Sequence, residues 1–170
     1  MSRVTPCELP KVALLNRYKD EHYTDCFSAD IDGNVSHQDY VENFYRTWLF
    51  KSERLILKWA VSKPSTDEQV GQLARGDIDA FAAWTVEDRA ENQLLLCDFR
   101  GKTRSWLMVE PANEEGAAHT RLYFGSAVIS TEKNDDSSAE MGSSFKLLLG
   151  LHKLYSKALL KAVLRRLRNH

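Results

Sequence analysis

The spacing of apolar residues near the end of the chain predicts a long amphipathic helix over about residues 145–168. At about 100° per residue, one continuous face collects Leu147, Leu148, Leu151, Leu154, Tyr155, Ala158, Leu159 and Ala162. Ser144 offers an N-cap oxygen, and Gly142 is expected to interrupt what precedes it. Further apolar residues widen the arc beyond one contact surface, so we expect the helix to lie across something broad.

Alternation near the start of the chain predicts a strand over residues 22–31. One face carries Tyr23, Phe27, Ala29 and Ile31 together with Asp25. Asp32-Gly33-Asn34 is typical of a turn. Before this strand, residues 12–15 could form a short turn of helix.

Capping patterns predict two or three short helices after this strand. Ser36 with Asp39 opens one helix, and a second helix is expected over residues 54–61. Ser65 with Glu68 caps a third, over residues 67–75, which Gly76 ends.

The middle of the chain changes to strand periodicity. Strands are predicted over residues 80–88, 93–99, 103–110 and 120–129, and the two short connections favour antiparallel hairpins. These strands are apolar on both faces, so we expect a cover on each side of the sheet. Gly125, inside the last strand, indicates a bulge or a close approach of the backbone.

The polar, acidic stretch over residues 131–142 predicts a flexible loop before the final helix. The whole chain of 170 residues is then a single α+β domain. Its expected form is a curved antiparallel sheet gripping the long C-terminal helix, with the short helices on one face.

This order of elements resembles the helix-grip fold of the START-like superfamily, which is also described as polyketide-cyclase-like or pollen-allergen-like. The stretches FAAWTVEDR, RSWLMVEP and TRLYFGSAVI are similar to an uncharacterised bacterial branch of it. About five strands are predicted here, whereas typical members have six or seven. The resemblance implies a cavity for a hydrophobic or amphipathic small molecule between the sheet and the final helix. Some relatives are enzymes and others carry or sense ligands, so the fold does not fix the function.

The charge is uneven along the chain although its formal net value is -1. Residues 143–170 carry seven Lys or Arg and no acid, which leaves 16 basic against 24 acidic residues elsewhere. A basic ridge on a helix usually faces solvent, with weak contact to a membrane surface as an alternative. No nucleic-acid partner is expected.

The cysteines and the N-terminal segment favour a cytoplasmic protein. Cys7, Cys26 and Cys97 are isolated in the sequence and predict neither a disulfide framework nor a zinc site. No signal peptide is recognisable, and no apolar run approaches the roughly 20 residues of a membrane span. The histidines show no metal-ligand spacing, and no cofactor fingerprint occurs, so no metal or cofactor is expected.

Candidate ligand-binding residues are aromatic or charged positions on the strands and apolar positions on the final helix. Indole and phenol groups combine apolar area with a polar tip, which suits a cavity. The candidates are Trp84, Asp98, Arg104, Trp106, Tyr123, Leu151 and Tyr155. The alternative is that the aromatic residues are plain core and that Arg104, Asp98, Arg121 and Glu87 form ion pairs on the sheet surface.

Three hypotheses for function follow. The first is binding of a small hydrophobic or amphipathic ligand. The second is an enzyme of cyclase or hydratase type that uses Asp25, Asp98, Arg104 or Tyr123, which requires at least two of them in one pocket. The third is a homo-oligomeric interaction module, such as a homodimer, without a ligand.

Overall fold

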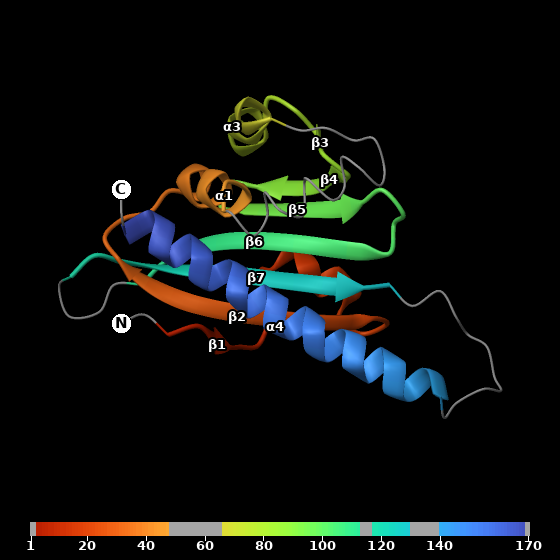
Figure 1. Ribbon diagram of the computed structural model, residues 1–170. Helices are drawn as coiled ribbons and strands as arrows, with labels where there is room; N and C mark the ends of the chain where they lie inside the picture. Colours follow the sequence, from red (N-terminus) through yellow and green to blue (C-terminus); the bar gives the residue numbers. More distant parts are fainter. Residues whose placement is uncertain (1–2, 48–65, 113–116, 130–139, 169–170) are drawn as a thin grey trace.

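The computed structural model describes residues 3–47, 66–112, 117–129 and 140–168, with only the backbone course for residues 140–153. Its centre is a curved, antiparallel seven-stranded sheet (Figure 1). The strand order is β1-β2-β7-β6-β5-β4-β3, and each strand pairs antiparallel with its neighbour. The α+β class and the curved antiparallel sheet with a C-terminal helix are as predicted.

The strands extend over the following bounds: β1 Thr5–Pro6, β2 Tyr23–Asp32, β3 Ala80–Phe81, β4 Trp84–Ala90, β5 Gln93–Asp98, β6 Thr103–Pro111 and β7 His119–Val128. Two of them were not predicted. β1 is too short to show a period, and the predicted strand over residues 80–88 is split in two by a tight connection in which Ala82 has a φ of 53°. These two strands bring the predicted five to seven.

The helices are η1, a 3-10 helix over Leu14–Tyr18, and the α-helices α1 His37–Tyr45, α3 Asp67–Arg75 and α4 Glu140–Arg168. The N-cap of α1 is as predicted, because the Ser36 hydroxyl accepts from the Asp39 amide. The cap of α3 is Thr66, not Ser65, in a reciprocal capping box with Gln69. The predicted helix over residues 54–61 and most of the predicted acidic loop lie outside the described residues.

Helix α4 begins at Glu140, so the predicted start at about residue 145 was wrong by about five residues. The side that faces the sheet also differs from the prediction. Leu154 is 66% exposed, whereas Leu160 and Val163 are fully buried. The broad apolar arc contains two stripes, and the sheet takes the one centred on Leu160, Val163 and Leu164. The sequence pattern does not distinguish two adjacent stripes of similar polarity.

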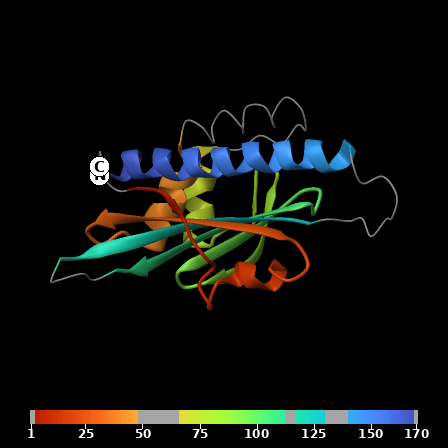
Figure 2. The same ribbon diagram turned by 90° about the horizontal axis from the view of Figure 1, so that it is seen from below.

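Both faces of the sheet are covered, as the two-sided apolar strands predicted. Helix α4 lies across one face and η1 lies against the other (Figure 2). On the α4 face, Phe27, Leu107 and Phe124 form a core with α1, α3 and α4. On the η1 face, Trp106 and Met108 form a second, smaller core with Leu15 and its neighbours.

Gly125 marks a close approach and not a bulge, because the β2–β7 and β6–β7 registers run through it without a break. A Cβ atom at Gly125 would lie 2.9 Å from Leu15 Cδ2 and 2.9 Å from Trp106 Cε3. Because Gly125 has no Cβ atom, η1 can pack directly against the sheet at this point.

Candidate functional site

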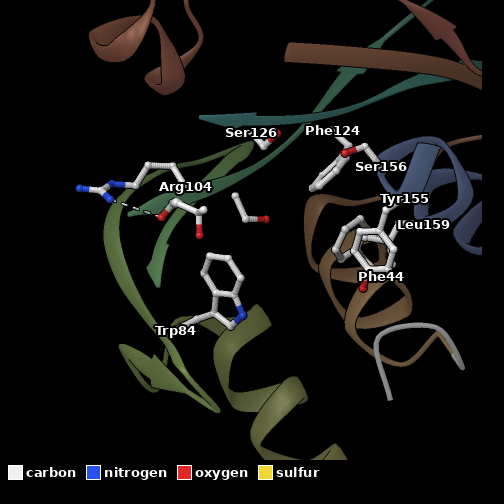
Figure 3. A pocket seen from close by; sticks show the side chains of 10 residues that line it. Phe44, Trp84, Arg104, Phe124, Ser126, Tyr155, Ser156 and Leu159 are labelled. Carbon is white, nitrogen blue, oxygen red and sulfur yellow. Dashed lines mark hydrogen bonds between the residues drawn. The ribbon is translucent and has the colours of Figure 1, made fainter. Parts of the chain in front are cut away.

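The α4 face of the sheet carries a partly open cavity of about 220 Å³ beneath the final helix (Figure 3). Its walls come from α1, β4, β6, β7 and α4, elements far apart in the sequence. The lining residues are Phe44, Trp84, Thr103, Arg104, Ser105, Phe124, Ser126, Tyr155, Ser156 and Leu159. This is the place between sheet and final helix where the resemblance implies a ligand cavity.

Alternation along the strands determines which side chains reach the cavity. On β6, Thr103 and Ser105 lie on the α4 face with Leu107, which belongs to the α4-face core. Arg104 lies between them and contributes its main-chain side, because its guanidinium extends away from the cavity (Figure 3). The walls are therefore aromatic and aliphatic, with small hydroxyl groups between.

The hydroxyl groups differ in what they already bind. Ser126 Oγ donates to Asp25 Oδ1 over 2.5 Å, and the Ser126 amide donates to the same oxygen. Within the described residues, Ser105 Oγ has no hydrogen-bond partner. Ser105 therefore offers the cavity a hydroxyl group that is available to a bound molecule.

Trp84 stands at the β4 side of the cavity and is partly buried (Figure 3). Its Nε1 atom is buried and has no hydrogen-bond partner among the described residues. A buried donor without an acceptor costs about 1–3 kcal/mol. The Trp84 indole therefore lines the cavity with a donor whose hydrogen bond is not made within the described residues.

The seven predicted ligand-binding residues do not share one site. Trp84 and Tyr155 line the cavity. Trp106 and Tyr123 lie in the core on the opposite face, where their ring centroids are 6.2 Å apart. Leu151 lies in α4, in the segment whose side chains are not described.

Asp98 ends its strand and shapes a turn. Its Oδ1 accepts from the amides of Lys102 (2.7 Å) and Thr103 (2.9 Å), in the hairpin between β5 and β6. This carboxylate therefore stabilises the β5–β6 connection, where Gly101 takes a φ of 68°.

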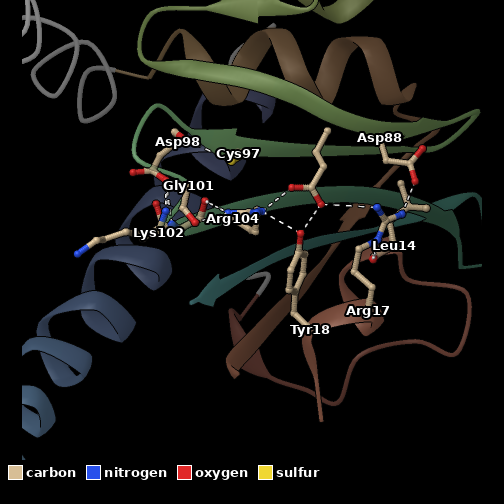
Figure 4. A network of polar contacts seen from close by, with 11 residues as sticks. Leu14, Arg17, Tyr18, Asp88, Cys97, Asp98, Gly101, Lys102 and Arg104 are labelled. Carbon is tan, nitrogen blue, oxygen red and sulfur yellow. Dashed lines mark hydrogen bonds and ion pairs between the residues drawn. The ribbon is translucent and has the colours of Figure 1, made fainter. Parts of the chain in front are cut away.

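Arg104 belongs to a polar network that fixes η1 to the sheet (Figure 4). Arg104 Nε donates to Glu87 Oε2 over 2.5 Å and lies 3.0 Å from Tyr18 Oη. Tyr18 donates to the other Glu87 oxygen, and Arg17 pairs with Glu87 and Asp88. The surface ion pair that was the alternative for Arg104 and Glu87 is thus present.

The surroundings of this network shift the pKa values of Tyr18 and Arg104. Burial raises the pKa of Tyr18, and the hydrogen bond to Glu87 adds to the effect. Burial opposes the charge of Arg104, but the Tyr18 hydrogen bond and the Glu87 carboxylate raise its pKa above the usual value. Tyr18 therefore stays neutral and Arg104 stays charged near pH 7, which suits a structural clamp.

A register shift between Val86 and Asp88 places two consecutive acids beside η1. In a bulge two residues oppose one on the partner strand. Both Glu87 and Asp88 contact Arg17 as a result. The regular alternation expected for this strand could not show this.

The residues of the cyclase or hydratase hypothesis do not converge. Asp25 lies on the α4 face beside Ser126. Arg104 and Tyr123 point to the η1 face, where Tyr123 donates to Glu110 over 2.9 Å. Burial and Glu110 raise the pKa of Tyr123 to about 12. Arg104 and Tyr123 are each held by a different acid, and the cavity beneath α4 does not bring two of the four groups together, although the hypothesis requires two of them in one pocket.

Among the described residues, no three His, Cys, Asp or Glu side chains gather closely enough to hold a metal ion. Within the same part of the chain, α4 and the other helices lack the length and apolar character of a membrane span. Surface contact with a membrane and a homodimer stay predictions.

Comparison with models of known protein families, with curated proteins and with solved structures finds no match. The arrangement of sheet and final helix is compatible with a helix-grip fold, and the assignment to that superfamily stays a resemblance.

Proposed function

We propose that the protein binds a small, mainly apolar molecule with a polar group in the cavity between the sheet and α4. The observation that carries the proposal is the composition of the walls. Phe44, Phe124 and Leu159 are nearly fully buried, and the serine hydroxyls stand among them. Apolar walls with a few polar groups that fix orientation are typical of ligand cavities.

The volume limits the size of the ligand. A cavity of about 150 Å³ holds benzene, and drug-sized ligands occupy roughly 300–1,000 Å³. The 220 Å³ found here lies between these values. A single aromatic ring with a short substituent therefore fits inside the cavity, whereas most of a phospholipid or a sterol would extend outside it.

The free hydroxyl of Ser105 favours a ligand with a hydrogen-bond acceptor. Acetophenone is a suitable probe because its ring matches the apolar walls and its carbonyl accepts one hydrogen bond. α-Methylstyrene has nearly the same shape but replaces the carbonyl oxygen with a methylene group. We expect acetophenone to bind with a Kd in the high micromolar range, given the affinity that a fragment of this size achieves, and α-methylstyrene to bind several-fold more weakly.

The test is a titration of both probes, followed by NMR of the backbone amides and indole groups. Ser105→Leu fills the cavity and is expected to weaken acetophenone binding at least ten-fold. Thr85→Leu adds a similar side chain at an exposed position of β4 outside the cavity and should leave binding unchanged. If neither probe binds, or if Ser105→Leu binds acetophenone as the unsubstituted protein does, the proposal is wrong.

A further inference from the structure

Two cysteines that are 19 positions apart in the sequence meet at the edge of the sheet: Cys7 directly follows β1, and Cys26 lies in β2. The register pairs Thr5 with Ser28 and Pro6 with Phe27, and the Cys7 amide donates to the Cys26 carbonyl over 3.0 Å. The two Sγ atoms are 3.1 Å apart, and both thiols are free. The sequence showed only isolated cysteines, because nothing in it indicates that such a short β1 pairs there.

The pair needs only a small movement to form a bond. A disulfide has an S–S length of about 2.05 Å, so the sulfurs must approach by about 1 Å. β1 has two residues, is exposed and pairs with β2 at one edge of the sheet. A short edge strand of this kind can shift by such a distance without disturbing the rest of the sheet.

The two thiols differ in exposure. Cys7 is half-buried and lines a surface hollow of about 210 Å³ together with Glu8, Lys19 and Thr24. Cys26 also lines this hollow but is only 5% exposed. Cys7 is therefore the more accessible of the two thiols to a reagent from solvent.

They also differ in acidity. The hydrogen bond between Cys7 and Cys26 lowers the pKa of Cys7 to about 7; Ser28 and Arg121 add to this effect, against the opposing effect of burial. The same hydrogen bond and burial raise the pKa of Cys26. Cys7 is thus the thiol that is ionised near neutral pH, and the thiolate is the reactive form.

From this geometry we propose that Cys7 and Cys26 are a redox-active dithiol that exchanges with small-molecule disulfides. In the first step the Cys7 thiolate attacks one sulfur of the disulfide, forms a mixed disulfide and releases one thiolate. In the second step the Cys26 sulfur attacks Cys7 Sγ, the intramolecular disulfide forms, and a second thiol leaves with the Cys26 proton. The thiolate released first takes up the proton that Cys7 lost on ionising, so the neutral dithiol loses two electrons and two protons in all, and the small disulfide is reduced to two thiols.

The first step prepares the second. The largest cause of the raised pKa of Cys26 is its hydrogen bond with Cys7, and the negative charge of the Cys7 thiolate adds to the effect after burial. When Cys7 is held in a mixed disulfide it no longer carries a charge, so Cys26 ionises more readily. The site lies on the η1 face of the sheet, apart from the cavity beneath α4, and does not depend on the proposed ligand.

The experiment equilibrates the full chain with reduced and oxidised glutathione at defined ratios, quenches with acid, and measures intact mass and peptide connectivity. The expected product has lost two hydrogens and contains a Cys7–Cys26 linkage. Cys26→Ser should instead accumulate one glutathione on Cys7. Cys7→Ser should stay reduced at Cys26, and Cys97→Ser should behave as the unsubstituted protein does.

Reaction rates supply a second readout. At pH 7 a thiol of pKa about 7 is about half ionised, so after allowing for its lower intrinsic nucleophilicity it should react with iodoacetamide at least about five-fold faster than Cys97. Burial raises the pKa of Cys97, which widens the difference. The proposal is overturned if oxidised glutathione leaves both thiols reduced, if Cys97 reacts first, or if Cys26→Ser yields no mixed disulfide on Cys7.

Discussion

At the scale of single residues, the two indole groups on opposite faces of the sheet provide a direct comparison. Trp106 is fully buried, and its Nε1 donates to Gln93 Oε1 over 2.9 Å. Trp84 is partly buried and its Nε1 has no partner among the described residues. We predict that Trp106→Phe lowers the free energy of unfolding by about 2 kcal/mol more than Trp84→Phe, since only the first loses a hydrogen bond.

Chemical denaturation of the two variants measures this difference. Trp84→Phe also removes an unsatisfied buried donor, so its total effect should be within about 1 kcal/mol of zero. Equal losses in both variants would show that Trp84 Nε1 has an acceptor in solution, such as a bound molecule. The ligand probes of the cavity would then be tested on the Trp84→Phe protein.

The burial of His37, the first residue of α1, makes the stability of the fold depend on pH. Its Nε2 is buried without a partner in the described part of the chain, and burial is the main cause that lowers its pKa to about 4. Arg89 adds to the effect and the Leu107 backbone opposes it. Because the unfolded chain takes up a proton near pH 6.5 and the folded protein does so only near pH 4, stability is fully present above 6.5 and falls between these values.

The measurement is urea denaturation at pH 7 and pH 5 for the unsubstituted protein and His37→Gln. We expect the unsubstituted protein to lose about 2 kcal/mol more than the variant between these pH values. Subtracting the loss in His37→Gln from the loss in the unsubstituted protein removes the contribution of the carboxylates, which is the same in both. An equal loss in both would mean that His37 is protonated in the folded state at pH 5.

At the scale of elements, the docking of η1 depends on the missing side chain at Gly125. A Cβ there would meet Leu15, Trp106 and the Asp25 carbonyl at 2.9 Å each, and the carbonyl is backbone that cannot yield easily. We predict that Gly125→Ala lowers the free energy of unfolding by about 1–3 kcal/mol through overpacking.

Gly71→Ala in α3 is the matched control. Its nearest contact is the flexible end of Arg75, at 3.1 Å, and alanine favours a helix over glycine by up to about 1 kcal/mol. Thermal denaturation of both variants measures the effects, and Gly71→Ala should be neutral or stabilising. A Gly125→Ala protein as stable as the unsubstituted one would show that η1 can lift away from the sheet at little cost.

At the scale of the whole molecule, the sequence predicts what depends on a period and misses what depends on register. The faces of β2, the cap of α1 and the cover on both sheet faces follow from spacing alone. The alternation within each strand does not show which of its two faces lies on the same side of the sheet as a given face of another strand. A shift of one residue in the register moves every side chain of a strand to the opposite face. Trp84 and Trp106 were therefore expected in one site although they lie on opposite faces, and the bulge at Val86–Asp88 reverses the rest of β4.

The same dependence on register hides the contact between Cys7 and Cys26, and this contact has a consequence for the stability of the whole chain. A disulfide that closes a loop of 19 positions is expected to add about 3 kcal/mol, mainly by restricting the unfolded chain. For a protein of this size that corresponds to a rise in Tm of roughly 6–12 °C.

Differential scanning calorimetry of glutathione-oxidised and fully reduced protein measures the rise, with Cys26→Ser treated in parallel as the control that cannot close the loop. The control should show no rise. Strain at β1 would reduce the gain, because the sulfurs must first approach by about 1 Å. If the disulfide-linked protein melts at or below the temperature of the reduced form, the strain cancels the gain from closing the loop. The disulfide would then be easily reduced, as expected of an exchanging disulfide and not of a stabilising structural one.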